Sequence, residues 1–417
     1  MTAEGPPPIR RLSDWDAAHL RDLADEHGTP LYVFDQKRVR ENVTNLEQAF
    51  HTEEISYAVK ANTVRATLET VADTGLGAEC ASAGEVQRAV DAGFDQVRYT
   101  AVNPPPEDLD HAIALSKDPE TEDLDLVITI GAADTLEALE ERDYDGPLAI
   151  RVNPGVGAGH HAKVTTGDAP KFGVPYSRVS NLADVAVERG FDLAGLHAHA
   201  GSGIHDDEDL AAHRELVSRM GDLARDLGPD LDFLNVGGGL GVPYRPEEEP
   251  LDLDAVASAT REAAGDLRAT LGIEPGRYVV ADAGVLLTTV NAVKPTPETT
   301  VVGVDAGMAT LLRPAMYDAY HEIRSLAPDT DGRESVTATV AGPICETADV
   351  LGRDRALPDP VRGDVLAIGN AGAYGYEMAL NYNSRPRPAV VSLDGNVSQL
   401  AVERETLSDL TRLETEQ

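Results

Sequence analysis

Residues 55–62, Ile55-Ser56-Tyr57-Ala58-Val59-Lys60-Ala61-Asn62, are a run of strand-forming residues that ends in a lysine and a turn. The chain has only six lysines among its 417 residues. An amine at the carboxyl end of a buried strand is partly desolvated, which disfavours its charged form and makes the neutral nucleophile available. Lys60 is therefore a candidate Schiff-base lysine, although an isolated lysine after a strand is more often an ordinary solvated side chain.

Runs of similar strand character alternate with helical patterns through the first two-thirds of the chain. The helical patterns cover residues 82–92, 179–189, 210–227 and 253–271. The strand-like runs are 55–59, 76–80, 96–100, 126–130, 148–152, 193–197, 233–236 and, as the weakest candidate, 271–274. Eight strands that alternate with helices predict a parallel α/β barrel of the TIM type, and a doubly wound open sheet is the competing fold.

The pattern of predicted elements changes at about Asp282, from alternating strands and helices to strands alone. Beyond it the strand-like runs are 285–293, 299–304, 335–341, 365–368, 389–393 and 397–403, with turns between them. The amino-terminal run 31–34 is a candidate to join the same sheet. We therefore expect an α/β barrel over residues 35–281 and an all-β domain formed by residues 1–34 and 282–417.

The composition points to an unusual environment. The formal net charge is −37, and the acidic residues are spread along the chain. Strong salt screens such self-repulsion, since the Debye length falls to roughly 3 Å at 1 M. Without salt the repulsion destabilises the folded state. We interpret the pattern as adaptation to high salt in a halophile, and we expect neither nucleic acid nor an anionic membrane as a partner.

Targeting and redox signals are few. No run of eighteen apolar residues predicts a membrane span, and residues 1–8 lack the apolar core of a secretory signal. Cys80 and Cys345 lie far apart in the sequence, so neither a disulfide framework nor a cysteine metal site is expected. Free thiols fit the reducing cytoplasm.

Three further motifs follow the expected strands, and active sites of barrel enzymes lie at the carboxyl ends of the strands. Residues 196–203, Leu-His-Ala-His-Ala-Gly-Ser-Gly, offer an imidazole to stack on a flat cofactor and a hydroxyl to reach a phosphate. Residues 235–241, Asn-Val-Gly-Gly-Gly-Leu-Gly, let the backbone approach an anion closely. Residues 274–277, Glu-Pro-Gly-Arg, supply a carboxylate that would keep a pyridine nitrogen protonated.

These glycines do not have the spacing of a nucleotide site. Neither the dinucleotide pattern GxGxxG nor the phosphate loop GxxxxGK[ST] occurs. A site for a single phosphate group is therefore more plausible, although a glycine turn without a ligand is about equally common.

Taken together, the motifs resemble those of the fold-type III, alanine-racemase-like decarboxylases, which use pyridoxal 5′-phosphate. The resemblance runs in family order from about residue 30 to 385 and is specific as a set. It is carried by residues 57–62, 151–155, 171–173, 196–203, 235–241, 274–277, 304–308, 312–317, 342–346 and 372–375. It implies a pyridoxal-phosphate-binding barrel, a β-rich domain and a homodimer with shared active sites.

The resemblance also implies roles at the cofactor. Lys60 would hold the aldehyde carbon as an imine, His199 would stack on the pyridine ring, and Glu274 would pair with the ring nitrogen. The remaining cofactor-binding residues would surround the phosphate: Ser202, Gly238, Gly239, Gly276, Arg277 and Tyr374.

The implied substrate is meso-2,6-diaminopimelate, which loses CO₂ to give L-lysine. Cys345 is implied as a catalytic proton donor that enters the site from the other subunit together with Glu346, although Lys60 could also deliver that proton. The implied substrate-binding residues are Arg277, Arg313, Tyr317, Glu346 and Tyr374.

Two alternatives stay open at this point. A related decarboxylase could act on ornithine, arginine or carboxynorspermidine, but ornithine-type relatives have no distal carboxylate to bind and place aspartate after the cysteine. Arg313 and Glu346 favour diaminopimelate, because a guanidinium fork suits a carboxylate. A non-enzymatic regulator is disfavoured by the presence of both Lys60 and Cys345.

Overall fold

The chain forms two compact units in the computed structural model, which describes residues 6–100, 102–156, 171–199, 201, 203–227 and 230–415. The first, which we call the barrel unit, comprises Met1–Pro6, Arg40–Val242 and Leu251–Val279. The second, which we call the sheet unit, comprises Pro7–Val39, Pro243–Pro250 and Val280–Gln417.

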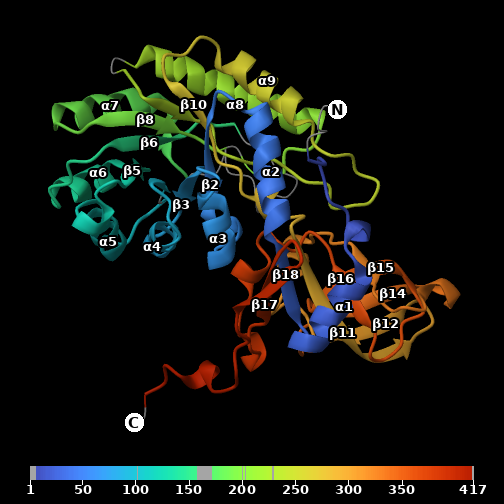
Figure 1. The fold of residues 1–417 in the computed structure, drawn as a ribbon. Helices are drawn as coiled ribbons and strands as arrows, with labels where there is room; N and C mark the ends of the chain where they lie inside the picture. The colour runs from blue at the N-terminus through green and yellow to red at the C-terminus, as the bar shows by residue number, and fades with distance from the viewer. Residues whose placement is uncertain are drawn as a thin grey trace. The chain divides into compact units, whose positions relative to one another are not determined.

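Eight parallel strands of the described residues close on themselves in the barrel unit, and Figure 1 labels several of them. Their order is β5-β4-β3-β2-β10-β9-β8-β6, and pairing of β5 with β6 completes the ring. The predicted barrel is thus confirmed, and the open sheet is wrong. The strands are β2 Glu54–Ala58, β3 Gly77–Cys80, β4 Gln96–Thr100, β5 Asp125–Ile130, β6 Leu148–Asn153, β8 Leu193–His197, β9 Phe233–Asn235 and β10 Thr270–Ile273, with β7 Val174–Pro175 paired to β6.

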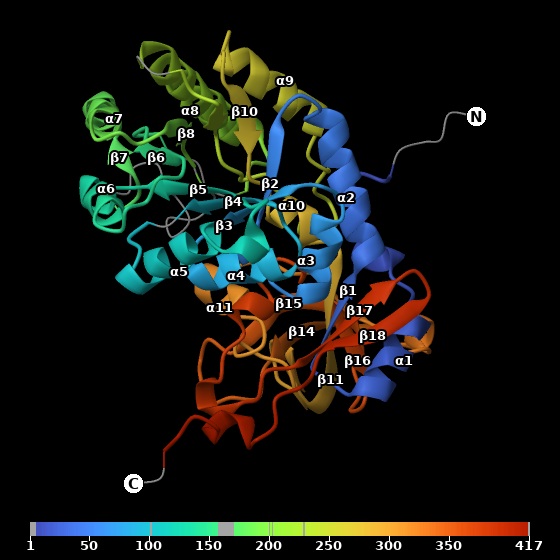
Figure 2. The same cartoon turned by 60° about the vertical axis from the view of Figure 1, so that its left-hand side comes forward.

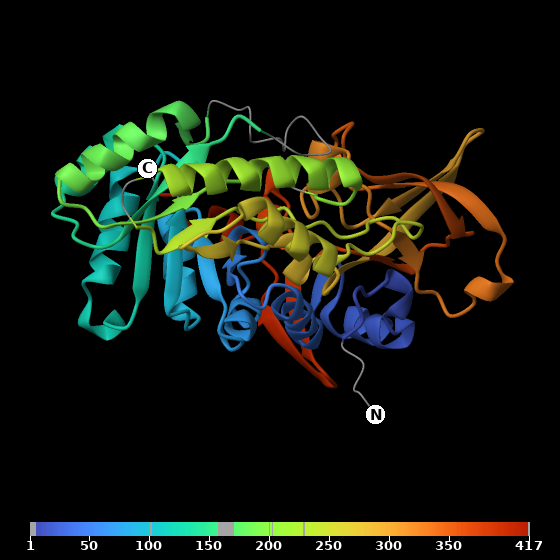
Figure 3. The same cartoon turned by 90° about the horizontal axis from the view of Figure 1, so that it is seen from above.

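Helices connect the barrel strands, and Figure 2 shows several of them around the strands. The long helices α8 and α9 lie side by side, as Figure 3 shows in yellow-green and yellow. The helices are α2 Gln36–Ala49, α3 Arg65–Ala72, α4 Ala83–Asp91, α5 Pro106–Ser116, α6 Ala133–Glu140, α7 Val179–Glu188, α8 Asp207–Asp226, α9 Leu253–Ala264 and α10 Arg277–Val280. None of the helices in the described ranges has the length and apolarity needed to cross a bilayer.

The end of α9 corrects one prediction. The helical pattern continues to residue 271, but the helix ends at Ala264, and Gly265 follows with φ +68°. Glycine adopts this conformation readily and is the usual residue after a helix end. The early stop leaves Thr270–Ile273 free to form β10, which is the weakest of the expected strands.

The barrel strands are mostly apolar because both of their faces are covered. Val127, Ala149, Ala194 and Phe233 form one buried cluster. Gly195 is required beside them, since a Cβ there would lie 2.6 Å from the Phe233 ring.

The sheet unit is built on a mixed sheet whose order is β15-β14-β12-β11-β1-β17-β18, with β16 paired to β11 and to β13. β1 joins this sheet as expected, antiparallel to β11 and parallel to β17. The strands are β1 Leu31–Asp35, β11 Gly284–Pro295, β12 Thr300–Val304, β13 Ile323–Ser325, β14 Ser335–Ala341, β15 Val350–Pro358, β16 Val365–Ile368, β17 Ala389–Asp394 and β18 Val397–Val402. The unit also contains two α-helices among its described residues, α1 Ala17–His27 and α11 Arg313–Tyr317.

Short 3-10 helices complete the secondary structure of the described residues. They are η1 Leu12–Asp14, η2 Val59–Ala61, η3 Pro119–Thr121, η4 Tyr176–Arg178, η5 Thr330–Gly332, η6 Tyr376–Met378, η7 Tyr382–Ser384 and η8 Asp409–Thr411.

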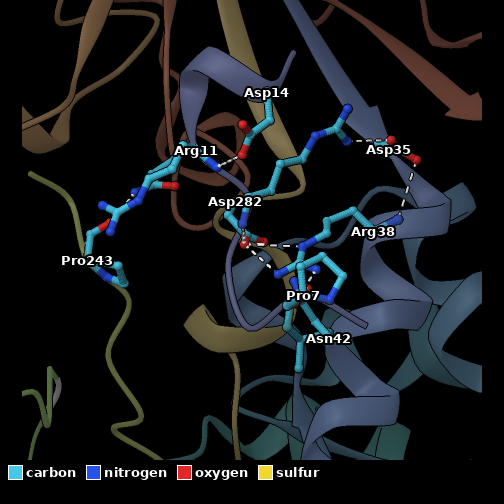
Figure 4. A network of polar contacts seen from close by, with 11 residues as sticks. Pro7, Arg11, Asp14, Asp35, Arg38, Asn42, Pro243 and Asp282 are labelled. Carbon is cyan, nitrogen blue, oxygen red and sulfur yellow. Dashed lines mark hydrogen bonds and ion pairs between the residues drawn. The ribbon is translucent and has the colours of Figure 1, made fainter. Parts of the chain in front are cut away.

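A buried ion pair anchors the amino-terminal segment within the sheet unit (Figure 4). The Arg38 guanidinium lies 2.9 Å from a carboxylate oxygen of Asp282, and both side chains are less than 5% exposed. Arg38 also donates to the carbonyl oxygen of Pro7, and the backbone amide of Arg10 donates to Asp282. The three contacts satisfy charges that would be costly to bury alone.

Candidate active site

Lys60 lies in η2, directly after β2, and its amine is paired with a neighbouring carboxylate. The Nζ atom is 2.6 Å from Oε2 of Glu79 on β3. The Lys60 side chain is 42% exposed, whereas Glu79 is 2% exposed. The expectation of a desolvated amine is therefore not met, because the amine is accessible and an adjacent carboxylate favours its charged form.

A second buried pair joins β8 to the end of β10. Nε2 of His197 lies 2.9 Å from Oε2 of Glu274, and the two side chains are 3% and 5% exposed. The register places His197 beside Arg151 on β6 and beside Asn235 on β9, all at the carboxyl ends of their strands. The pair is thus built by the barrel and not by a loop.

Burial shifts both groups of this pair toward their neutral forms. Desolvation raises the pKa of Glu274 to about 7, against the opposing charges of Lys60, Arg151 and Arg98. Desolvation also lowers the pKa of His197 well below its usual range, and the charge of Arg151 acts in the same direction. The hydrogen bond between Nε2 of His197 and Oε2 of Glu274 therefore joins two groups whose neutral forms are favoured.

Each member of the pair keeps one buried atom without a hydrogen-bond partner. These atoms are Nδ1 of His197 and Oε1 of Glu274. Buried polar atoms without partners are rare in folded proteins, and such an atom often marks a ligand site. The unpaired carboxyl oxygen is an acceptor available to a protonated ring nitrogen.

His199 and the glycine segment after β9 lie against each other. The backbone amide of Gly238 donates to Nδ1 of His199 over 3.2 Å. Burial lowers the pKa of His199 well below its usual value, and the charge of Lys60 adds to this effect. The imidazole is therefore neutral, which suits stacking on an aromatic ring.

The glycines of residues 237–239 and Gly276 are needed because neighbouring atoms leave no room for a Cβ atom at these positions. Gly237 and Gly239 have φ +79° and +98°, which side chains rarely adopt. A Cβ at Gly238 would overlap the carbonyl group of Glu274, and one at Gly276 would lie 3.0 Å from Ala58 and Ala61. Close packing thus brings the glycine segment, the Glu274 turn and the Lys60 turn together.

Arg151 adds a positive charge that the sequence motifs did not single out as a site residue. Arg151 is 8% exposed, and its guanidinium lies over the Phe172 ring, 5.3 Å from the centroid. Desolvation lowers the pKa of Arg151, while the charges of Glu79 and Glu274 oppose that shift. The barrel site therefore contains two cations and two carboxyl groups around the neutral histidines.

The sheet unit holds Arg313 in one orientation. Its Nη1 donates to the hydroxyl of Tyr244 and to Nε2 of His321, each over 2.9 Å. His321 in turn donates from Nδ1 to the carbonyl oxygen of Gly369, so its Nε2 is the acceptor. Arg313 is 7% exposed. Sequence reasoning missed both supporting residues, because His321 and Tyr244 lie on turns without a motif.

A buried carboxylate shapes the loop that carries Cys345 and Glu346. Asp349 is 3% exposed and accepts hydrogen bonds from the amides of Met308 and Ile344 at 2.6 and 2.8 Å. A Cβ on either Gly307 or Gly342 would overlap the Asp349 carboxylate. The Asp349 carboxylate and the two glycines packed against it therefore fix the loop from within. Cys345 itself is exposed, and Glu346 is half-buried.

The remaining predicted site residues fall in three groups. Arg277 begins α10 in the barrel unit, directly after Gly276. Tyr317 ends α11 and Tyr374 has φ +55°, both within the sheet unit. Ser202 lies outside the described residues. Unit by unit, the structure brings together Lys60, His199, Gly238, Gly239, Glu274 and Gly276 in the barrel, and Arg313, Tyr317, Cys345, Glu346 and Tyr374 belong to the sheet unit.

Comparison with known families and proteins agrees with this geometry. Residues 36–281 match the family described as pyridoxal-dependent decarboxylase, pyridoxal binding domain. A diaminopimelate decarboxylase from Methanothermobacter thermautotrophicus is 42% identical over 407 residues, covering 94% of this chain and 92% of the relative. One from Archaeoglobus fulgidus is 35% identical over 407 residues, covering 95% of both.

A solved structure extends the likeness to three dimensions. The crystal structure of diaminopimelate decarboxylase from Helicobacter pylori complexed with L-lysine superposes with a TM-score of 0.85 at 32% identity. It covers 95% of this chain and 99% of that one.

The residues of the barrel site fit pyridoxal phosphate. Glu274 keeps an unpaired buried oxygen for a ring nitrogen, and the amine of Lys60 is accessible. The glycine segment admits no side chain and leaves its backbone to approach an anion. By family match, by full-length likeness and by a site that suits its cofactor, this chain belongs to the diaminopimelate decarboxylase family of pyridoxal-dependent decarboxylases.

Proposed function

We propose that this protein decarboxylates meso-2,6-diaminopimelate to L-lysine and CO₂ with pyridoxal 5′-phosphate, the last step of lysine biosynthesis. The observation that carries the proposal is the 42% identity over nearly the whole chain to a relative of that name. The barrel site supports it, because it holds an accessible amine and a buried carboxyl group in one unit.

The cofactor-binding residues contact four parts of the cofactor. Lys60 holds the aldehyde carbon, His199 packs on the ring, and Glu274 holds a proton at the ring nitrogen. Gly238, Gly239, Gly276, Arg277, Tyr374 and Ser202 surround the phosphate. When bound, pyridoxal phosphate supplies an electron sink for the electron pair that departing CO₂ leaves behind.

His197 is a positioning residue for Glu274. Its Nε2 atom is hydrogen-bonded to Oε2 of the carboxyl group, which leaves Oε1 to face the ligand. A carboxyl group whose pKa is about 7 without ligand accepts a proton readily, and a cationic ring beside it favours the ionised form. The histidine fixes the geometry of this exchange without carrying charge itself.

Glu79 is positioned to handle the proton of Lys60. The amine must be neutral to attack a carbonyl carbon. The Glu79 carboxylate, 2.6 Å away and almost fully buried, is in position to accept that proton. The same pair returns the proton when Lys60 acts as an acid.

The substrate is recognised at its distal end. Arg277, Arg313 and Tyr317 bind the distal carboxylate, Glu346 binds the distal ammonium group, and Tyr374 completes the pocket. The buried orientation of Arg313 supports this role, because His321 and Tyr244 fix the guanidinium before substrate arrives. Ornithine and arginine lack the distal carboxylate that these groups would bind.

Cys345 and Glu346 act in the active site of a second subunit, so the working form is a homodimer. The exposure of Cys345 supports this assignment. We expect hybrids of a Cys345→Ala chain and a Lys60→Ala chain to recover about a quarter to a half of wild-type activity, since one of the two sites is then intact. No recovery in hybrids that have been shown to form would contradict sharing.

The protein works in a salt-rich cytoplasm. The net charge of −37 and the free thiols Cys80 and Cys345 support this setting. We expect the midpoint of urea unfolding to rise steadily with potassium chloride up to molar concentrations. A midpoint that is independent of salt would contradict the assignment.

The deciding experiment follows lysine and CO₂ from meso-diaminopimelate at high salt, with and without added pyridoxal phosphate. We expect turnover that depends on the cofactor, and borohydride should fix the cofactor covalently on Lys60. Ornithine, arginine and carboxynorspermidine serve as competing substrates. A preference for any of them, or an adduct on another residue, would overturn the proposal.

A further inference from the structure

The sheet unit contains an arginine-lined pocket outside the residues assigned to catalysis. It has a volume of about 350 Å³ and lies between α11 with its following turn, the start of β15, and the segment that contains Arg245. Three guanidinium groups line it, those of Arg245, Arg353 and Arg355. Three cations around one hollow are unusual in a chain that has 72 acidic and 35 basic residues.

An aromatic ring organises two of these cations. The guanidinium carbons of Arg245 and Arg355 lie over the Tyr320 ring, 4.2 and 3.9 Å from its centroid. Cation–π contacts of this kind hold a guanidinium in place while its N–H groups stay free to donate. Tyr320 thus keeps two like charges near each other at one wall of the pocket.

Carboxylates do not neutralise the cluster closely. Arg245 lies 3.8 Å from Glu248, whereas Arg353 and Arg355 form no ion pair within 4.0 Å in the part of the chain that the structure describes. Asp318 lines the pocket, and Asp354 stands between the two arginines in sequence. Both aspartates are exposed to solvent, so the guanidinium groups keep donors available.

Arg355 shows most clearly that a partner is missing. Its Nε is buried and has no hydrogen-bond partner, and its Nη1 donates only to the carbonyl oxygen of Arg353. Desolvation lowers the pKa of Arg355, and the neighbouring charge of Arg245 adds to this effect. An anion in the pocket would relieve both penalties.

We propose that this pocket binds a small, doubly charged oxyanion, either a phosphate ester or a dicarboxylate. Guanidinium groups bind both chemistries through paired N–H donors. A volume of about 350 Å³ is within the range of small-molecule sites.

The pocket shares its walls with the segments that carry the proposed substrate residues. Pro314 and Ala315 of α11 line it, and the same short helix carries Arg313 and Tyr317. Ala348 lines it from the loop that carries Glu346. A bound anion would hold these segments in place and should lower KM for diaminopimelate; this consequence rests on the proposed function, whereas binding itself does not.

Binding is tested first without substrate. Inorganic phosphate and succinate are titrated into the cofactor-loaded protein by calorimetry, with potassium chloride setting a constant ionic strength. We expect saturable binding of one anion per chain by at least one of the two probes. The double variant Arg353→Gln/Arg355→Gln should bind at least ten-fold more weakly, and Arg268→Gln, an exposed arginine on the barrel unit, should bind like the wild type.

The two probes distinguish the ligand classes. Phosphate binding alone indicates a phosphate ester, succinate binding alone indicates a dicarboxylate, and binding of both indicates recognition of any compact dianion. No saturable binding of either probe, or binding that the double variant retains in full, overturns the proposal.

Two milder variants cover the case in which the double variant does not fold. Arg353 is exposed, so Arg353→Gln removes one donor group at little structural cost. Arg355→Lys keeps the positive charge but removes the paired N–H donors of the guanidinium group. Each should weaken binding measurably, and unchanged binding in both would overturn the proposal. A fall in KM with added phosphate or succinate, absent from these variants, then tests the coupling separately.

Discussion

The buried histidine–glutamate pair of the barrel unit differs from the loop of the sheet unit that carries Cys345 and Glu346. In the barrel unit, His197 and Glu274 are paired and no more than 5% exposed. In the sheet unit, Cys345 is exposed and Glu346 is half-buried, and a buried carboxylate supports their loop from behind. The barrel therefore presents a preformed site for a cofactor, whereas the loop of Cys345 and Glu346 presents side chains that need something else to surround them.

The two cysteines show the same contrast. Cys80 on β3 is fully buried, and desolvation raises its pKa well above the usual value. Cys345 lies on an exposed turn. A buried thiol is inert packing, whereas an exposed one is available for chemistry.

The largest expected effect tests the barrel side of the comparison. Lys60→Ala should reduce kcat/KM by at least about 10⁴-fold, because no other described group replaces the amine that holds the cofactor. CO₂ release and borohydride labelling measure the loss. Lys117→Ala, a surface lysine of the same unit, is the matched control and should keep wild-type activity. Retained turnover in Lys60→Ala would show that Lys60 is not the residue that holds the cofactor.

The next effect tests the sheet unit. Arg313→Ala should raise KM for diaminopimelate by an amount equivalent to about 2–5 kcal/mol, since a buried, charged contact to the substrate is lost. Initial rates over a range of substrate concentrations measure it. The exposed Arg362→Ala is the control. An unchanged KM would mean that Arg313 serves the fold of the sheet unit alone.

Glu274→Gln tests how burial of this carboxyl group affects the stability of the cofactor-free protein. The pKa of Glu274 is about 7 in the folded protein, above its ordinary value of 4.5. Between these two pH values the native state binds more protons than the unfolded state, so the free energy of unfolding falls as pH rises. A neutral glutamine avoids this loss. We expect the cofactor-free variant to be more stable than the wild type by roughly 3 kcal/mol at pH 8 and by little at pH 5.

Urea unfolding of both cofactor-free proteins at the two pH values checks this expectation. The difference between the proteins is the informative quantity, because the other acidic groups are common to both. A variant that is equally stable or less stable at pH 8 would show that the barrel tolerates the ionised carboxylate.

The smallest effect concerns the thiols. Iodoacetamide should modify Cys345 at least about 100-fold faster than Cys80, which reacts only after local opening of the barrel. Peptide mass spectrometry follows both sites, and Cys345→Ser should abolish the fast phase. Bound lysine should slow the reaction at Cys345. Equal rates at the two cysteines would contradict the difference in exposure between Cys80 and Cys345.

Much of the architecture was predictable because strand patterns repeat regularly in the barrel. β4, β8, β14 and β16 have the predicted bounds, and the other predicted barrel strands differ from the prediction by one residue at one or both ends. β15 was missed because polar residues occupy its middle and Asp354 has φ +54°, which interrupts the alternation. Strand periodicity cannot reveal a strand that bends.

The site was predictable only where residues sit inside motifs. His199 and Glu274 stand in such motifs, and His197 could have been found, since it ends its strand and barrel sites lie at the carboxyl ends of the strands. The supports of Arg313 could not, because His321 and Tyr244 are brought to it from separate turns of the sheet unit. The roles of Glu79 and Arg151 likewise could not be predicted, because their contacts in the site come from neighbouring strands of the barrel.

The place of β1 has a consequence for how the chain is made. Leu31 pairs with Leu287 on one side and with Ala389 on the other, so an early strand is completed by a late one. During synthesis the barrel segments, which end at Val279, leave the ribosome long before β17 does. The barrel can therefore begin to fold on the ribosome. The edge of β1 that pairs with β17 stays unpaired until nearly the whole chain has been synthesised.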